Sequence, residues 1–459
     1  MHSQKTNNKL KFLFVFLLLI FIFKPKKLLG QTNLSLNTKF KEGLKIYMND
    51  DSSRYLKASG LAQIWLRYND NNPGSAIYGD EVKKTFDVGI RRMRYQVLSQ
   101  LNRRVFFYSQ IGINSVNYLS ARKTQIFFHD VTAEYEVLKK FLTIGIGLHG
   151  WNGISRYSSS GVANILCLDL PVVQESTNDI SDQFVRKNGI FLKGKIKSLD
   201  YRISISNPYP IQQVSSVASL PASETNVAYF STKAPELQYQ GYFMWQFLEK
   251  ESNQVPYMTG SYLGKKRVLT LGAGFASQKN AMWYRNVELD TISCQMLQLG
   301  VDLFYDYAFN KAKENALTLY ISYLNYDFGP NFIRNTGIMN TANSAGSGIT
   351  FGGYGDALPY YGTGKVMYGQ MAYLFRKDLL GKQGTIQPYV SGFNANYERL
   401  TNSFFVYNLG INWIQNGQQS KISFDYQSRP IFVISANEKP REIKSARRGC
   451  VIIQYQVTF

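Results

Sequence analysis

The sequence lacks long apolar runs once its first residues are past. After residue 31 there is no sustained apolar period of 3.6 residues and no apolar run long enough for a membrane helix, which needs about 20 residues. The mean hydropathy of −0.23 agrees with this. The sequence therefore excludes a helical membrane protein.

Cysteine and histidine are scarce as well. The three cysteines, Cys167, Cys294 and Cys450, are odd in number and far apart, so no disulfide framework is predicted. No phosphate-binding loop, dinucleotide fingerprint or Cys/His metal spacing is present. We therefore expect no enzyme, no cofactor and no metal site. A lipid-hydrolysing barrel stays open only if His129 or His149 lies beside an outward-facing serine.

The first 30 residues are typical of a signal peptide. Lysines precede an unbroken apolar run from Phe12 to Phe23, and Gly30 follows closely. Twelve residues at about 1.5 Å each are too short to cross a hydrocarbon core of roughly 30 Å. A removable leader explains this pattern better than a membrane anchor does, so the sequence predicts export.

Charge is strongly one-sided. The formal net charge is +21, and it falls to +15 without the six lysines of residues 1–30. Such an excess indicates contact with nucleic acid, an anionic membrane surface or anionic solutes. Export argues against nucleic acid, so we expect anionic lipid, lipopolysaccharide or small anions as partners.

What the sequence does have is aromatic residues and alternation. Aromatics make up 15% of the chain, with 32 tyrosines. Apolar and polar residues alternate over segments of about ten residues, as in 450–459, and the apolar faces end in Tyr, Trp or Phe. A soluble sandwich would bury a mostly aliphatic face, whereas aromatic girdles are typical of barrels in lipid. The sequence predicts an all-β, transmembrane antiparallel β-barrel in a bacterial outer membrane.

The alternating segments number 16, and an even count puts both termini in the periplasm. Residues 55–459 would form the barrel and residues 31–54 a periplasmic lead-in. Eighteen strands remain an alternative if 250–265 or 278–296 hides another pair. The expected strands are 56–70, 84–101, 104–115, 123–138, 141–150, 182–196, 199–207, 236–248, 266–277, 297–308, 315–327, 364–377, 384–398, 403–417, 420–428 and 449–459.

Long and short connections mostly alternate between the strands, as outer loops and periplasmic turns should. Two connections break the rule: 249–265 is long where a turn is expected, and 399–402 is short where a loop is expected. The loop 150–183 contains an apolar patch, so we expect it to fold inward as a constriction; packing on other loops or another subunit is the alternative. The remaining long connections lie near 70–83, 208–235, 278–296, 328–363 and 429–448.

Alternation also assigns side chains to the lumen, because a basic residue facing lipid costs about 2–4 kcal/mol at mid-membrane. Arg91 is expected at the outer interface instead. Either the lumen residues form a basic path that attracts anions, or they are ion-paired filler. The basic candidates are Arg67, Arg92, Arg94, Arg202 and Lys421, and the acidic candidates are Asp130, Glu134 and Glu136.

Several strand motifs resemble the phosphate-selective porin O/P family. This resemblance covers most of the chain after residue 31, and it implies a 16-stranded, usually trimeric barrel with an inward third loop and a basic anion path. The closing Tyr455, Val457 and Phe459 resemble the signal that barrel-assembly machinery reads. The motifs are 61–68 (LAQIWLRY), 72–74 (NPG), 86–94 (FDVGIRRMR), 263–275 (LGKKRVLTLGAGF) and 455–459 (YQVTF).

In one respect the sequence departs from that family. The family's narrow zone is rich in Arg and Lys, whereas residues 150–183 contain only Arg156. We therefore expect a homotrimeric porin for passive diffusion of small polar solutes, with a general anion preference in place of phosphate selectivity. The alternative is a barrel with a blocked pore that serves as a structural or docking subunit of a larger outer-membrane assembly.

Overall fold

The computed structural model describes residues 43–211, 224–433 and 439–459. The predicted signal peptide, 1–30, and most of the predicted lead-in lie outside these residues. Within the described part of the chain, no helix is long and apolar enough to span a membrane.

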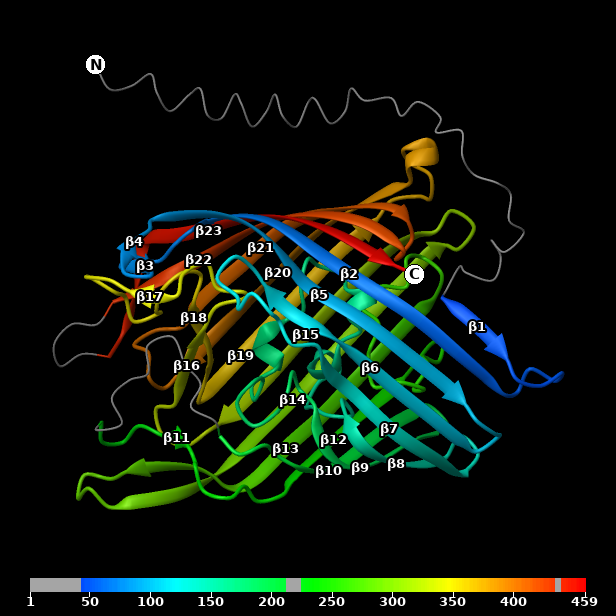
Figure 1. Cartoon of the computed structure of the whole chain (residues 1–459), viewed down its shortest axis with the longest axis horizontal. Helices are drawn as coiled ribbons and strands as arrows, with labels where there is room; N and C mark the ends of the chain where they lie inside the picture. Colours follow the sequence, from blue (N-terminus) through cyan, green and yellow to red (C-terminus); the bar gives the residue numbers. More distant parts are fainter. Residues whose placement is uncertain (1–42, 212–223, 434–438) are drawn as a thin grey trace. The chain divides into compact units, whose positions relative to one another are not determined.

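Sixteen strands form a closed antiparallel barrel, as predicted from the alternation (Figure 1). Each strand pairs with the next along the chain, and the last, β23, pairs with the first, β2, from Leu61↔Thr458 to Asn69↔Cys450. The strands are β2 (Tyr55–Asp70), β5 (Lys84–Gln100), β6 (Val105–Val116), β7 (Phe127–Leu138), β8 (Leu142–His149), β9 (Lys187–Ile196), β10 (Leu199–Asn207), β12 (Gln238–Gln246), β13 (Arg267–Arg285), β14 (Thr291–Asn310), β15 (Asn315–Asp327), β19 (Gly364–Leu374), β20 (Thr385–Tyr397), β21 (Phe404–Asn416), β22 (Ser420–Val433) and β23 (Arg441–Thr458).

Shorter elements flank the barrel or lie in its connections. Strand β1 (Leu44–Tyr47) pairs with the start of β2, and β11 (Tyr229–Phe230) pairs with β13, so neither adds a strand to the ring. The other elements are β3 (Ser75–Ile77), β4 (Asp80–Glu81), β16 (Ile333–Thr336), β17 (Ser344–Ala345), β18 (Leu358–Gly362) and four 3₁₀ turns: η1 (Arg156–Ser159), η2 (Val162–Asn164), η3 (Val172–Gln174) and η4 (Gly381–Gln383).

The outer surface of the barrel is apolar, because alternate residues of each strand face away from the lumen. Leu271, Met367 and Phe405 are about half exposed on well-separated strands. At the end of the barrel that carries the short turns, outward aromatics stack along β14, with the rings of Tyr305 and Tyr307 5.5 Å apart. A belt of this kind is costly in water and suits a bilayer with aromatic interfaces.

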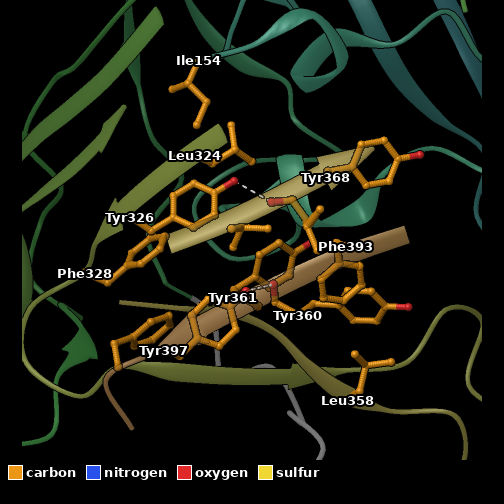
Figure 2. Packing of buried hydrophobic residues seen from close by; sticks show 14 of the residues in the cluster. Ile154, Leu324, Tyr326, Phe328, Leu358, Tyr360, Tyr361, Tyr368, Phe393 and Tyr397 are labelled. Carbon is orange, nitrogen blue, oxygen red and sulfur yellow. Dashed lines mark hydrogen bonds between the residues drawn. The ribbon is translucent and has the colours of Figure 1, made fainter. Parts of the chain in front are cut away.

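The hydrophobic core lies inside the barrel. Inward-facing aromatic residues of β15, β19 and β20 pack against the connection 328–363, which folds over them. Figure 2 shows Tyr326, Tyr360, Tyr361 and Tyr397 gathered there, all of them buried. The Tyr397 hydroxyl donates to the Tyr360 carbonyl at 2.6 Å. One side of the interior is thus packed like the core of a soluble protein.

Two predicted long loops are wrong. Residues 278–296 mostly extend β13 and β14 into a long hairpin with a bulge between Gln278 and Met282. They hide no additional barrel strand. Much of 429–448 continues β22 and β23, which pair as far as Val433↔Arg441. Beyond the lipid-facing belt both faces of a strand meet water, so apolar and polar residues no longer alternate. The sequence pattern therefore underestimated the length of these strands.

The expected position of Arg91 is also wrong. Gln63 of β2 pairs with Arg92, and the next residue, Ile64, pairs with Ile90, so Arg91 is an extra residue in β5. A bulge of this kind turns the extra side chain away from its alternating position. Arg91 is 8% exposed and lies on the inside of the barrel.

Tight strand packing gives a first prediction. A Cβ added at Gly194 in β9 would lie 1.8 Å from the Phe141 carbonyl oxygen, whereas at Gly369 in β19 the nearest atom would be 3.8 Å away. Gly194→Ala should therefore lower the free energy of unfolding by about 1–3 kcal/mol, and Gly369→Ala should change it little. Urea unfolding in detergent or vesicles measures both; equal effects of the two substitutions would contradict the packing described.

Candidate functional site

The lumen is the candidate site, and its two ends differ. The turn end carries the C-terminus and most of the short connections, and the loop end carries the long ones (Figure 1). Three connections enter the lumen: residues 150–186 from the loop end (the loop-end segment), residues 328–363, also from the loop end, and residues 247–266 from the turn end (the turn-end segment).

The loop-end segment crosses the lumen along a row of polar wall residues. Four side chains of β2, β21, β22 and β23 donate to its backbone carbonyls between residues 162 and 166. The donors are Gln63 to Val162 at 3.2 Å, Gln456 to Ala163 at 2.9 Å, Lys421 to Ile165 at 2.8 Å and Asn412 to Leu166 at 2.8 Å. Lys421 is therefore bound to the segment and does not face open water.

The same segment also contacts the opposite wall. The backbone amide of Arg156 donates to Asp302 at 2.7 Å, Ser176 donates to Gln298 at 2.7 Å and Gln174 donates to Ser322 at 2.9 Å. These wall residues belong to β14 and β15. Contacts on both sides fix the segment across the middle of the barrel.

Asp169 joins the loop-end segment to the basic residues of β5. Its carboxylate lies 2.8 Å from Nε of Arg91 and 2.5 Å from Nη2 of Arg92. Burial raises the pKa of Asp169, but the two guanidinium groups outweigh this and hold it below its ordinary value. Asp169 therefore stays ionised near neutral pH.

Arg94 differs from the other predicted basic residues. It donates to the carbonyls of Met93 at 2.9 Å and Ile113 at 2.6 Å and to the Asn114 side chain. None of the described acidic groups pairs with it, and its Nε has no partner among the described residues. Arg94 lines a cavity of about 40 Å³ together with Arg91, Arg92, Arg186 and Glu175. Four guanidinium groups therefore surround this cavity.

Arg67 and Arg202 hold the other two inward connections. Arg67 pairs with Asp87 at 2.9 Å and with Asp356 of the 328–363 connection at 3.2 Å. Arg202 donates to the Pro256 carbonyl of the turn-end segment at 2.7 Å. Both arginines are buried, at 1% and 4% exposure.

The predicted acidic residues lie on the inward face of β7. Asp130 accepts a hydrogen bond from Tyr257 of the turn-end segment and pairs with Arg186 at 3.6 Å. Glu134 pairs with Lys193 at 2.7 Å. Glu136, near the turn, accepts from the backbone of Lys140 at 2.8 Å.

The C-terminal residues singled out in the sequence face outward. Tyr455 is 44% exposed and Phe459 is 55% exposed, with Val457 between them on the same face. Phe459 exchanges two backbone hydrogen bonds with Gly60 of β2, which completes the seam.

Both remaining histidines lie inside the barrel and are fully buried. His129 packs against Phe127 and Phe184, and His149 Nδ1 accepts from the Trp151 amide at 3.2 Å. A lipid hydrolase would need an imidazole beside an outward-facing serine, and neither histidine has that position. Among the described residues, no group of His, Cys, Asp and Glu is arranged to hold a metal ion.

The lumen is nearly filled at the height of these contacts. Gln63, Gln454 and Gln456 face inward and are at most 1% exposed. A cavity of about 70 Å³ lies between residues 167–173 and the wall near Trp65. At about 10–15 Å³ per water, cavities of this size hold only a few molecules.

Sequence reasoning missed several residues of this arrangement. Lys193 follows the same alternation as the residues that were found, opposite the outward-facing Ile190 and Leu192 of β9. For Arg91, the sequence signal is a break in the alternation: the outward-facing apolar residues stand at even positions up to Ile90 and at odd positions from Met93 onward. Asp169 and Glu251 lie in irregular connections, where no periodicity could have identified them.

Comparison with known proteins supports the fold alone. No protein-family model matches the sequence, and no curated protein matches it. The chain is similar in structure to OmpF of Salmonella typhi, solved with daunomycin (TM-score 0.52, 10% identity, covering 91% of this chain and 100% of that one). It is also similar to OprB of Pseudomonas putida (TM-score 0.52, 10% identity, covering 88% and 94%). The barrel thus resembles bacterial outer-membrane porins, which agrees with its apolar outer belt.

The Asp169 contact generates a second prediction. Asp169→Asn leaves two buried guanidinium groups without their carboxylate, which should cost about 3 kcal/mol of unfolding free energy at pH 7. Because the folded pKa of Asp169 is lowered, its contribution is complete above the ordinary carboxyl pKa of about 4 and is lost as pH falls below that range. The difference from wild type should therefore shrink in acid.

Urea unfolding at pH 7 and pH 3 measures this difference. Asp80→Asn in the exposed strand β4 is the matched control and should have little effect at either pH. A difference for Asp169→Asn that stays the same at pH 3 would show that the carboxylate does not act through its charge.

Proposed function

We propose that this chain is an outer-membrane channel for small polar solutes, with a narrow lumen that favours anions. The observation that carries the proposal is a closed 16-strand barrel with an apolar outer belt and a charged lumen crossed by the loop-end segment. The turn end would face the periplasm, as in the expectation from the even strand count. The proposal includes no catalytic step.

Anion preference is supported by the charges around the 40 Å³ cavity. Its lining includes Arg91, Arg92, Arg94 and Arg186, with Glu175 as the acidic member. Asp169 compensates Arg91 and Arg92 in part, and Asp130 pairs with Arg186. The cationic groups still outnumber the carboxylates, and a positive ring in a low-dielectric lumen attracts anions.

Phosphate selectivity is not part of the proposal. The one arginine of residues 150–183, Arg156, is fully buried and pairs with Glu251 at 2.6 Å. It cannot act as a free phosphate ligand while this pair is formed. A homotrimer, and recognition of the outward-facing Tyr455, Val457 and Phe459 by assembly machinery, are proposed on the family resemblance.

A second candidate function follows from the filled lumen: a structural or docking subunit whose pore stays blocked. The long hairpin of β13 and β14 supports it, because Val287 and Leu289 at its tip are 81% and 63% exposed. A partner protein could cover them. A stoichiometric partner that co-purifies in mild detergent, together with no conductance, would favour this function over a channel.

Bilayer recording tests the channel directly. Purified protein in a planar bilayer under a KCl gradient should give small conductance steps and a reversal potential on the anion side. Arg92→Gln combined with Arg94→Gln should move the reversal potential toward zero, because two cationic groups leave the cavity. The control is Arg103→Gln in the exposed β5–β6 turn. A cation-sided reversal potential in wild type would exclude the anion preference.

The selectivity should also depend on pH. Burial raises the pKa of Glu175 to about 7, although Arg92 partly opposes the shift. As pH falls from 8 to 6, Glu175 becomes neutral and the lumen becomes more positive, so the anion preference should increase. Glu175→Gln should show the low-pH selectivity at both values. A pH response that survives in Glu175→Gln would assign it to another group.

A further inference from the structure

The turn-end segment is unusual for a connection at this end of the barrel. It joins β12 to β13 through residues 247–266, whereas the connection between β9 and β10 has only two residues, Lys197 and Ser198. The sequence left its length unexplained. In the structure it enters the lumen and meets the loop-end segment, which comes from the opposite end.

The two segments are joined by backbone hydrogen bonds. The Met258 amide donates to the Ser159 carbonyl at 2.8 Å, and the Gly161 amide donates back to Met258 at 2.8 Å. The amides of Gly260 and Ser261 donate to the Asn164 carbonyl at 3.0 and 3.1 Å. These hydrogen bonds stabilise the contact between the two segments, because a buried amide or carbonyl without a partner costs free energy.

A charge pair adds to this junction. Arg156 of the loop-end segment forms two hydrogen bonds with Glu251 of the turn-end segment, at 2.8 and 2.6 Å, and a third with the Thr259 carbonyl at 2.8 Å. Tyr262 also donates to Glu251, at 2.7 Å. Arg156 and Glu251 are 0% and 3% exposed. A bidentate pair in a buried position is both strong and directional.

The wall holds the turn-end segment through basic side chains. Lys193 donates to the Gln254 carbonyl at 2.8 Å, Lys195 donates to the Glu251 carbonyl, and Arg202 donates to Pro256. Tyr257 contacts Asp130 and Arg186 beside the arginine-lined cavity. These contacts are polar and lie against one wall, and they add to the apolar packing of Met258 against Tyr242 and Met244 and of Leu263 against Ala316, Leu374 and Ile414.

We propose that the turn-end segment is a second closure of the lumen, which is held against the loop-end segment by the Arg156–Glu251 pair. The channel opens when the two segments part. This inference rests on the proposed channel function. It assigns Glu251 and the turn-end segment to gating, while the charges of β5 set the selectivity.

The chain carries a native reporter for this closure. Cys167 is 3% exposed and follows directly after Leu166. A Cβ at Gly260 of the turn-end segment would lie 2.9 Å from the Leu166 amide nitrogen. Cys167 itself lines the cavity of about 70 Å³, whose lining includes no residue of the turn-end segment. Withdrawal of the turn-end segment should expose Cys167 by freeing residues 164–166, and the rate of thiol modification measures that exposure without any requirement for ion flow.

Two variants release the closure in different ways. Glu251→Gln removes the charge pair, and Glu249→Gln, which affects an exposed pair with Lys311, is its matched control. The second variant replaces residues 250–266 with Asn-Gly. Because the Glu249 amide already donates to the Arg267 carbonyl, a two-residue turn can close this hairpin. Heat-modifiable gel mobility checks that each barrel is folded.

The measurements are the rate at which a small methanethiosulfonate reagent modifies Cys167, assigned by peptide mass mapping, and the conductance in a planar bilayer. Glu251→Gln should raise the modification rate at least about tenfold, since loss of a buried charge partner shifts such equilibria by more than that. The Asn-Gly variant should raise it further, and conductance should rise in parallel. Glu249→Gln should match wild type.

The outcomes separate the two ideas. If Cys167 is modified at the wild-type rate in both variants, the second closure is overturned. The proposed channel would still stand if the wild-type protein conducts. Faster modification of Cys167 without conductance in any variant would support the closure and reject the proposed channel.

Discussion

The interior of this barrel is governed by the cost of burying charge. An isolated cation in a low-dielectric interior is costly by several kcal/mol, and it is tolerated only with partners that compensate it. Arg67, Arg92, Arg202 and Lys421 project inward because their strands alternate, and each is compensated by a carboxylate or carbonyl of an inward-folded connection. The connections and the basic wall residues therefore depend on each other.

The interior is also divided into two kinds of environment. Near β15, β19 and β20 it is aromatic and packed, and near β2, β5 and β23 it is polar and charged. The loop-end segment contributes to both, with Ile154 and Tyr157 in the aromatic cluster and Asp169 among the arginines. Such an arrangement fixes the segment more firmly than charge pairs or apolar contacts would alone.

Most of the fold could be predicted from the sequence, because the requirement that one strand face meets lipid imposes a period of two on every strand. That period gave the sixteen strands and the inward direction of residues such as Arg94 and Glu134. At the Arg91 bulge the alternation shifts by one residue between Ile90 and Met93, and an interpretation that assumes unbroken alternation assigns Arg91 to the wrong side. The period of two could not locate Asp169 or Glu251, whose positions depend on three-dimensional contacts between irregular connections. The sequence pattern also could not predict that the lumen is nearly filled. Alternation shows which side chains face inward, but it does not show which connections fold into the lumen.

The seam between β2 and β23 has a consequence for how the barrel forms. Gln63 and Gln456 form a hydrogen bond across it although they are 393 positions apart in the chain. One edge of β2 therefore remains unpaired until β23 is available to pair with it. Contacts of such long sequence separation form slowly, and an unpaired edge is prone to wrong pairing meanwhile. Strand β1 covers the part of that edge next to Tyr55–Ala58 from the start. The protein therefore protects part of its first barrel strand with a neighbouring segment of its own chain, and only the length matched by β23 depends on the arrival of that strand.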